Sequence, residues 1–177
     1  MNRRDLFRAS AAGLAGAAGL RASDQAPGPA IRDDESLLVA RDPKWQPRVL
    51  DAHQNETVIA LAEQIIPRTD TPGAADAEIN RYVDLFLTHD EELRHRFFAG
   101  LNSLDGHAME GHGVSFARCT PAQQSDLLAS LESNSDDFFS LAKTLVARIY
   151  FNTPQGFQEL NKFGVPRSPG CEHASHG

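Results

Sequence analysis

Apolar residues recur along most of the chain at the spacing of an α-helix. From about residue 54 they fall three and four positions apart, on one helix face, and Pro67 ends that run. Four later stretches repeat the spacing, and Thr153-Pro154 starts a short sixth one. No alternating, strand-like pattern of similar strength occurs. The sequence predicts an all-α fold, a single small domain of five or six short helices. The positions expected to face inward are Val58, Leu61, Ala62, Ile65 and Ile66; Ile79, Tyr82, Val83, Phe86 and Leu87; Leu93, Phe97, Leu101 and Leu104; Leu127, Leu128 and Leu131; Phe138, Leu141, Ala142, Leu145, Val146 and Ile149; and Phe157 and Leu160.

Local signals predict where several helices begin or break. Thr120-Pro121-x-Gln123 is a capping box with proline at the first helical position. Asp76 is expected to cap the helix that contains Ile79. The glycine-rich stretch 105–115 is expected to be a loop.

The chain divides into four segments by composition. Residues 1–22 have the character of an export signal, and residues 23–50 are rich in proline and charge, as in an extended linker or arm. Trp45 stands out in this arm and is expected to anchor it to another surface. Residues 51–165 form the predicted helical domain, and 166–177 an irregular tail.

Net charge narrows the choice of partners. The chain carries a net charge of -7, and the residues after the first 23 hold ten more acidic than basic side chains. Binding to a phosphate backbone needs clustered Lys and Arg, so nucleic acid is excluded as an expected partner. An anionic membrane surface is disfavoured for the same reason.

The N-terminus resembles a twin-arginine export signal. The segment Arg3-Arg4-Asp5-Leu6-Phe7-Arg8 has two arginines, a variable residue, two large apolar residues and a base. An Ala/Gly/Leu run follows, too short to span a bilayer, which needs ~20 apolar residues. An ordinary secretion signal is the alternative, and the pattern leaves open whether the signal is cleaved. Because the twin-arginine route moves folded proteins, often with a cofactor bound, a chain with this signal is expected either to hold a cofactor or to travel with a partner that does.

Motifs for cofactor binding or catalysis are missing from the sequence. It contains no G-x-G-x-x-G, P-loop, C-x-x-C-H or G-x-S-x-G segment, so no cofactor and no catalytic residue are expected in this chain. A single Glu92-x-x-His95 lies in a charged run, which favours a solvated helix face over a di-iron site. Cys171-x-His173-x-x-His176 matches no established zinc spacing, so no metal site is predicted.

Cys119 and Cys171 are the two cysteines. In an oxidising compartment they are candidates for a disulfide, which would close a long loop and stabilise the fold by ~4 kcal/mol. Pairing of one cysteine with a partner chain is the alternative, and the sequence does not decide between the two.

Three segments resemble the gluconate 2-dehydrogenase subunit 3 family. They are Leu61–Ala74 (LAEQIIPRTDTPGA), Ile149–Gly156 (IYFNTPQG) and the Gly170-Cys171 ending. The resemblance implies a small subunit of a membrane-associated dehydrogenase. It also implies a large FAD-containing flavoprotein partner that oxidises a sugar, polyol or sugar acid, and a cytochrome c subunit carrying haem c. The small subunit would supply the export signal, read by the twin-arginine translocase, and help the flavoprotein mature, which places the complex in the periplasm.

Two further readings stay open beside this resemblance: a stand-alone exported metal-binding or redox protein that uses His and Cys, and a helical protein without a partner. If the chain is the accessory subunit that the resemblance implies, a partner interface is expected, because apolar surface patches mark interfaces. Plain core packing is the alternative role for each aromatic residue. The candidate interface residues are Trp45, Tyr150, Phe151, Gly156, Phe157 and Phe163.

Overall fold

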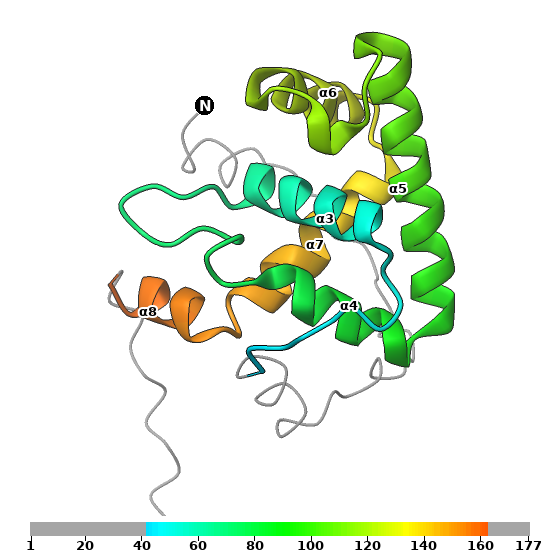
Figure 1. Ribbon diagram of the computed structural model, residues 1–177. Helices are drawn as coiled ribbons and strands as arrows, with labels where there is room; N and C mark the ends of the chain where they lie inside the picture. Colours follow the sequence, from blue (N-terminus) through cyan, green and yellow to red (C-terminus); the bar gives the residue numbers. More distant parts are fainter. Residues whose placement is uncertain (1–41, 163–177) are drawn as a thin grey trace, which may run out of the picture. The chain divides into compact units, whose positions relative to one another are not determined.

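The computed structural model describes residues 42–162, and every regular element in that range is helical. The all-α prediction is therefore confirmed, with six α-helices and one 3-10 turn in the described range (Figure 1). The elements are α3 (Ala52–Ile65), α4 (Ile79–His89), α5 (Glu91–His112), η1 (Phe116–Arg118), α6 (Pro121–Ser133), α7 (Asp137–Tyr150) and α8 (Pro154–Lys162).

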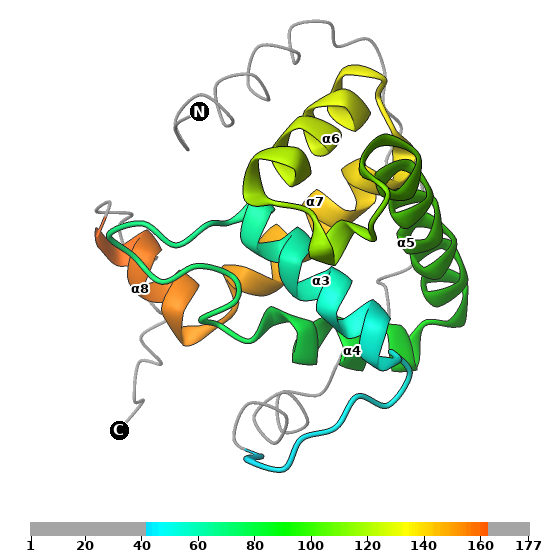
Figure 2. The ribbon, with the colours of Figure 1, turned by 45° about the horizontal axis from the view of Figure 1, so that its top comes forward.

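Helix α7 lies at the centre of the bundle and packs against α3, α4, α5 and α6. Figures 1 and 2 show α3 crossing over α7, with the long α5 along one side and α8 beyond the C-terminal end of α7. Close approach of α5 to α7 depends on Gly100, because a Cβ there would lie 1.9 Å from the Phe138 ring. The Phe97 and Phe138 rings meet edge to face at 5.5 Å beside it. The largest fully buried side chains are Tyr150, Phe97, Phe116, Leu61, Ile79, Leu85, Leu87, Leu101, Leu104, Val58, Val83 and Val146.

Helix starts are fixed mainly by side-chain caps. The capping box predicted at Thr120 is confirmed, since Thr120 and Gln123 bond each other's backbone amides. Asp51 and Gln54 form a second capping box, at the start of α3. The expected cap at Asp76 is wrong: α4 starts after Glu78, which has φ 51° and makes no side-chain cap bond. Asp76 instead accepts a hydrogen bond from the Gly73 amide at 2.8 Å, because it belongs to the loop before the helix.

The loop predicted over 105–115 is wrong for most of its length. Helix α5 continues through Gly106 and Gly111 to His112 and ends at Gly113, whose φ of 72° stops the helix. Each helical glycine costs about 1 kcal/mol relative to alanine. Burial of Leu104 and Ala108 against neighbouring helices offsets this cost, so tertiary packing overrides the local glycine signal.

Candidate partner-binding surface

A buried carboxylate ties the arm before α3 to the helical domain. Asp84, in α4, is 1% exposed and accepts three backbone hydrogen bonds from consecutive residues of the arm. Arg48 N donates to Oδ2 at 2.8 Å, and the amides of Val49 and Leu50 donate to Oδ1 at 3.0 and 2.9 Å. The apolar spacing did not predict this role, although Asp84 lies on the same helix face as Leu87, where an acid is unusual.

Trp45 sits further along this arm and is half-buried. The guanidinium of Arg81 lies 5.4 Å from its ring centroid, a cation–π contact. Arg81 Nη1 also donates to the Asp42 carbonyl oxygen at 2.9 Å. Trp45 therefore packs on α4 of its own chain, and the residue stays partly exposed.

The loop between α3 and α4 is held by Glu63. Its Oε1 accepts from the Arg68 amide at 2.9 Å and its Oε2 from the Ala75 amide at 3.4 Å, which fastens both ends of the loop to α3. Arg68 pairs with Asp76 across the loop at 3.2 Å. Gly73 is required inside it, because a Cβ there would lie 2.6 Å from the Arg68 nitrogen. The family-like segment Leu61–Ala74 thus builds a folded loop of fixed shape.

Tyr150 joins this loop to the end of α7 and to α8. Its ring is fully buried, and its hydroxyl oxygen lies 2.6 Å from the Pro72 carbonyl oxygen and 2.8 Å from Glu159 Oε2, two acceptors that share its single proton. Glu159 is itself buried, a role that the sequence did not predict because the apolar spacing in this helix marks Phe157 and Leu160. The second family-like segment therefore contacts the first one in space.

The turn from α7 to α8 explains the Thr-x-x-Gly part of that second segment. The Thr153 hydroxyl donates to the Tyr150 carbonyl oxygen at 2.7 Å and accepts from the Gly156 amide at 3.2 Å. A Cβ at Gly156 would lie 2.1 Å from the Tyr150 carbonyl oxygen, so only glycine allows α8 to pack this closely. Gly156 is buried and acts here as a packing residue.

The aromatic candidates divide by exposure. Tyr150 and Gly156 lie in the interior, whereas Phe151 is half-buried, with its ring edge to face with Tyr150 at 5.4 Å. Phe157 is 53% exposed, so the expectation that it faces inward is wrong; Glu159 occupies the inner face of α8 instead. Among the described residues the other large exposed apolar side chain is Met109, on α5. Among these candidates at the end of α7 and on α8, Phe151 and Phe157 are the ones that keep exposed side-chain surface.

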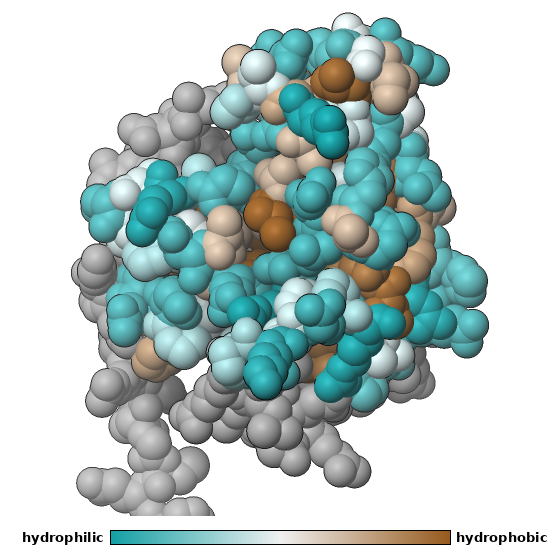
Figure 3. All heavy atoms as spheres, in the orientation of Figure 1, coloured by the Kyte–Doolittle hydropathy of each residue, from teal (hydrophilic) through white to brown (hydrophobic). Residues whose placement is uncertain are grey.

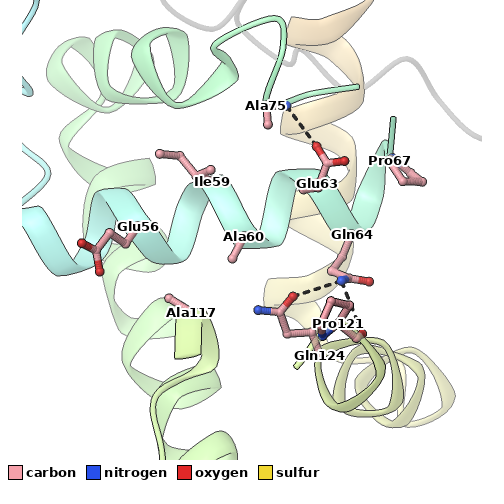
Figure 4. Close-up of a pocket in the computed structure, with 10 residues that line it drawn as sticks. All are labelled: Glu56, Ile59, Ala60, Glu63, Gln64, Pro67, Ala75, Ala117, Pro121 and Gln124. Atoms are coloured by element: carbon pink, nitrogen blue, oxygen red, sulfur yellow. Dashed lines mark hydrogen bonds between the residues drawn. The ribbon is translucent and has the colours of Figure 1, made fainter. Parts of the chain in front are cut away.

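A groove runs along the outer face of α3. It has a volume of about 710 Å³ and lies between α3, Ala75 of the loop, η1 and the start of α6. Figure 4 shows Glu63 reaching Ala75 at one wall and Gln64 meeting Gln124 at the other. The space-filling view in Figure 3 shows apolar patches among mostly hydrophilic residues on the face that α3 occupies. The groove is lined by Glu56, Ile59, Ala60, Glu63, Gln64, Pro67, Ala75, Ala117, Pro121 and Gln124.

The remaining candidates for chemistry are dispersed or lie outside the described range. Cys119 is a buried free thiol, and burial, together with the Asp105 carboxylate, raises the pKa of that thiol. Its suggested partner Cys171 is not among residues 42–162, so the disulfide stays a prediction. Glu92 and His95 are exposed on α5. Within residues 42–162 no three His, Cys, Asp or Glu side chains gather into a metal-binding group.

The export-signal residues Arg3, Arg4, Leu6 and Phe7 also lie outside the described residues, as do Phe163, His173 and His176. In the range 42–162 no helix combines the length and apolar character needed to cross a bilayer.

The fold and this surface define an all-helical domain in which buried polar groups fasten an N-terminal arm, a loop and a final helix to the core. The model of the gluconate 2-dehydrogenase subunit 3 family matches residues 52–169, about two thirds of the chain. The chain belongs to this family, which is that of an accessory subunit of a dehydrogenase complex. No curated protein and no solved structure matches the chain.

Proposed function

We propose that this chain is the non-catalytic small subunit of a periplasmic, membrane-associated, FAD-dependent sugar or sugar-acid dehydrogenase. Its large partner would be the flavoprotein that holds FAD, and a cytochrome c subunit with haem c would accept the electrons. The observation that carries the proposal is the family match over residues 52–169. The resemblance of Arg3-Arg4-Asp5-Leu6-Phe7-Arg8 to a twin-arginine signal supports a role in exporting and maturing the flavoprotein.

The proposal is tested by expressing the chain together with a flavoprotein encoded beside it. Pull-down of the tagged chain from the periplasm is expected to recover a larger protein with flavin absorbance. In the variant Arg3→Lys/Arg4→Lys the flavoprotein is expected to stay in the cytoplasm. Delivery of active flavoprotein to the periplasm by that variant would refute the export role. Bound metal or turnover in the purified chain alone would favour the alternative of a stand-alone metal-binding or redox protein.

For the contact with the flavoprotein we propose the corner formed by Phe151 and Phe157, with Trp45 as a further contact. Support comes from the exposure of Phe157, since aromatic anchors carry much of the binding energy in protein interfaces. The variant Phe157→Asp is expected to weaken co-purification at least ~10-fold. Met109→Asp is the matched control, because Met109 is 55% exposed on another helix. Equal loss in both variants would show that general solubility, and not this corner, was changed.

A further inference from the structure

The outward face of α3 carries an apolar stretch between two carboxylates. Ile59 and Ala60 line the groove along this helix, the α3 groove, and both keep part of their surface exposed. Glu56 precedes them by one turn and Glu63 follows them by one turn, a spacing that places all four residues on one helix face. Figure 4 shows the two apolar residues between the two carboxylates. The α3 groove therefore combines an accessible apolar strip with negative charge on both sides of it.

No basic side chain in the described part of the chain neutralises either carboxylate. Glu56 is exposed and forms no ion pair there. Glu63 accepts hydrogen bonds only from two backbone amides of the loop after α3. Two arginines adjoin the groove in sequence, but Arg68, which pairs with Asp76, and the exposed Arg118 do not line it. An occupant that brings its own cations would therefore find both carboxylates available.

The walls of the α3 groove suit a helix better than a small molecule. Ala75 and Ala117 face each other across it, and such small side chains allow a second helix to approach to the ~8–10 Å axis separation of packed helices. A small ligand needs several convergent polar groups to orient it. The amides of the groove are engaged within the chain, since Gln64 Nε2 donates to Gln124 Oε1 at 3.0 Å and Gln124 Nε2 donates to the Phe116 carbonyl oxygen at 2.9 Å. Apolar contact and charge are what the groove offers, as in helix-in-groove recognition.

We infer that the α3 groove docks an amphipathic helix of the flavoprotein, with two Lys or Arg side chains seven positions apart and apolar residues between them. Glu56 and Glu63 are themselves seven positions apart, a rise of ~10.5 Å. Two helices that cross at ~20° stay nearly aligned over this length, so bases at the same spacing meet both carboxylates. The apolar residues between the bases cover Ile59 and Ala60. The inference deepens the proposed function and rests on it in taking the flavoprotein as the partner.

Charge and position favour this occupant over a second copy. Contact between the α3 faces of two copies would set carboxylates against carboxylates, and residues 42–162 hold eighteen acidic and ten basic side chains. The groove also borders the loop after α3, in which Ala75 lines one wall and the Pro72 carbonyl oxygen meets the Tyr150 hydroxyl. Figures 1 and 2 show this loop running between α3 and α8. The groove, the loop and the Phe157 corner thus adjoin one another, and one large partner can contact all three.

The test co-expresses the full chain with the flavoprotein encoded beside it, with the photo-cross-linker p-benzoylphenylalanine in place of Ala117. This residue lines the wall opposite the loop, so its cross-links report on the groove and not on the Phe157 corner. Exposed Ala99 on α5 is the position control. In the co-purified complex, cross-links from position 117 are expected on a flavoprotein helix with two bases seven positions apart, and those from position 99 are not. Cross-links from position 117 to a second copy, to a segment without that spacing or to no protein in this complex would overturn the inference.

Charge reversal tests the carboxylates in the same complex. Glu56→Lys is expected to lower the cross-link yield at least about threefold, because like charges then oppose each other across the interface. Replacing one of the two partner bases by Glu in that variant is expected to restore the yield. Glu92→Lys, the same charge change on an exposed face of α5, should leave the yield unchanged. Equal yields in Glu56→Lys and the natural chain, or a loss that the partner change does not restore, would contradict the charge pairing.

A synthetic probe separates the groove from the identity of its partner. Two fluorescein-labelled helical peptides contain the same Lys, Leu and Ala residues, with the two Lys seven positions apart in one and three apart in the other. Fluorescence anisotropy with the full chain is expected to show at least about threefold tighter binding of the first peptide, a preference that Glu56→Lys removes. Equal affinities would overturn the groove assignment.

The two experiments also distinguish the inference from the proposed function. If the peptide preference is found but no flavoprotein co-purifies, the proposed function fails together with the flavoprotein as occupant, and the groove keeps its preference for a basic helix. If the flavoprotein co-purifies but position 117 gives no cross-link to it, the inference fails alone.

Discussion

Replacement of Asp84 by asparagine should detach the arm from the helical domain. The carboxylate accepts three backbone hydrogen bonds, two at Oδ1 and one at Oδ2, and it is 1% exposed. An amide keeps one accepting oxygen and places an NH₂ group where Oδ2 faced the Arg48 amide, so two donors oppose each other in a buried site. A hydrogen bond to a charged group contributes about 1.5–3 kcal/mol, and an unsatisfied buried donor adds to the loss. The expected cost is about 2–4 kcal/mol of unfolding free energy.

Urea unfolding of the full chain measures this cost. With an m-value of about 1.5 kcal/mol/M, the midpoint of Asp84→Asn should fall by about 1–3 M. Hydrogen exchange should locate the damage, because the amides of Arg48, Val49 and Leu50 lose their acceptor and should exchange at least about tenfold faster. Asp126→Asn, an exposed site in α6, is the control and should change the midpoint little. A loss below about 0.5 kcal/mol with unchanged exchange at these three amides would refute the role assigned to Asp84.

Further predictions concern three glycine positions and the buried thiol. Gly106→Ala should raise the unfolding free energy by about 1 kcal/mol, because the added Cβ meets open space in a helix. Gly113→Ala should lower the unfolding free energy by about 1–2 kcal/mol, because the backbone there has φ 72°. Thermal unfolding measures both changes, and a loss of stability in Gly106→Ala would argue against a helix at that position. Gly156→Ala should lower the unfolding free energy by about 3 kcal/mol and release α8 to limited proteolysis, because the new Cβ overlaps the Tyr150 carbonyl oxygen; native resistance would contradict this packing. Cys119 should be alkylated at pH 7.5 at least about tenfold more slowly than an exposed thiol in the same reduced chain. Because the pKa of Cys119 is raised above the ordinary 9.0, the folded state keeps the thiol proton to a higher pH than the unfolded state does. The unfolding free energy should therefore fall as the pH rises past 9.0, and fall less in Cys119→Ala. Parallel pH profiles of the two proteins would contradict the raised pKa.

The two family-like segments, Leu61–Ala74 and Ile149–Gly156, lie next to each other in the structure. Both could be read as partner motifs, yet in the structure they contact each other through Tyr150 and Pro72. Thr153 and Gly156 shape the turn that makes this contact possible. Much of the family-like pattern therefore serves to hold the α3–α4 loop and α8 against α7, and Phe157 is an exposed residue within α8.

Sequence alone determined the features that depend on short-range spacing. Helical periodicity predicted the all-α class, and the Thr120 capping box was found because its chemistry involves residues three apart in the chain. The family resemblance also came from contiguous segments, and the family match confirms it.

Tertiary structure alone decided the features that depend on contacts between distant residues. Helix α5 passes through Gly106 because neighbouring helices bury its apolar face. The free energy of that burial depends on distant residues and cannot be inferred from a local run of glycines. Glu159 turns inward and Phe157 outward because Tyr150 offers a hydroxyl partner nine positions earlier in the chain, on another helix. Asp84 meets the arm across more than 30 positions, and the α3 groove forms from residues between 56 and 124. The local sequence pattern determines which residues form helices. Apolar burial and hydrogen bonds between residues far apart in the chain determine which faces of the helices contact one another.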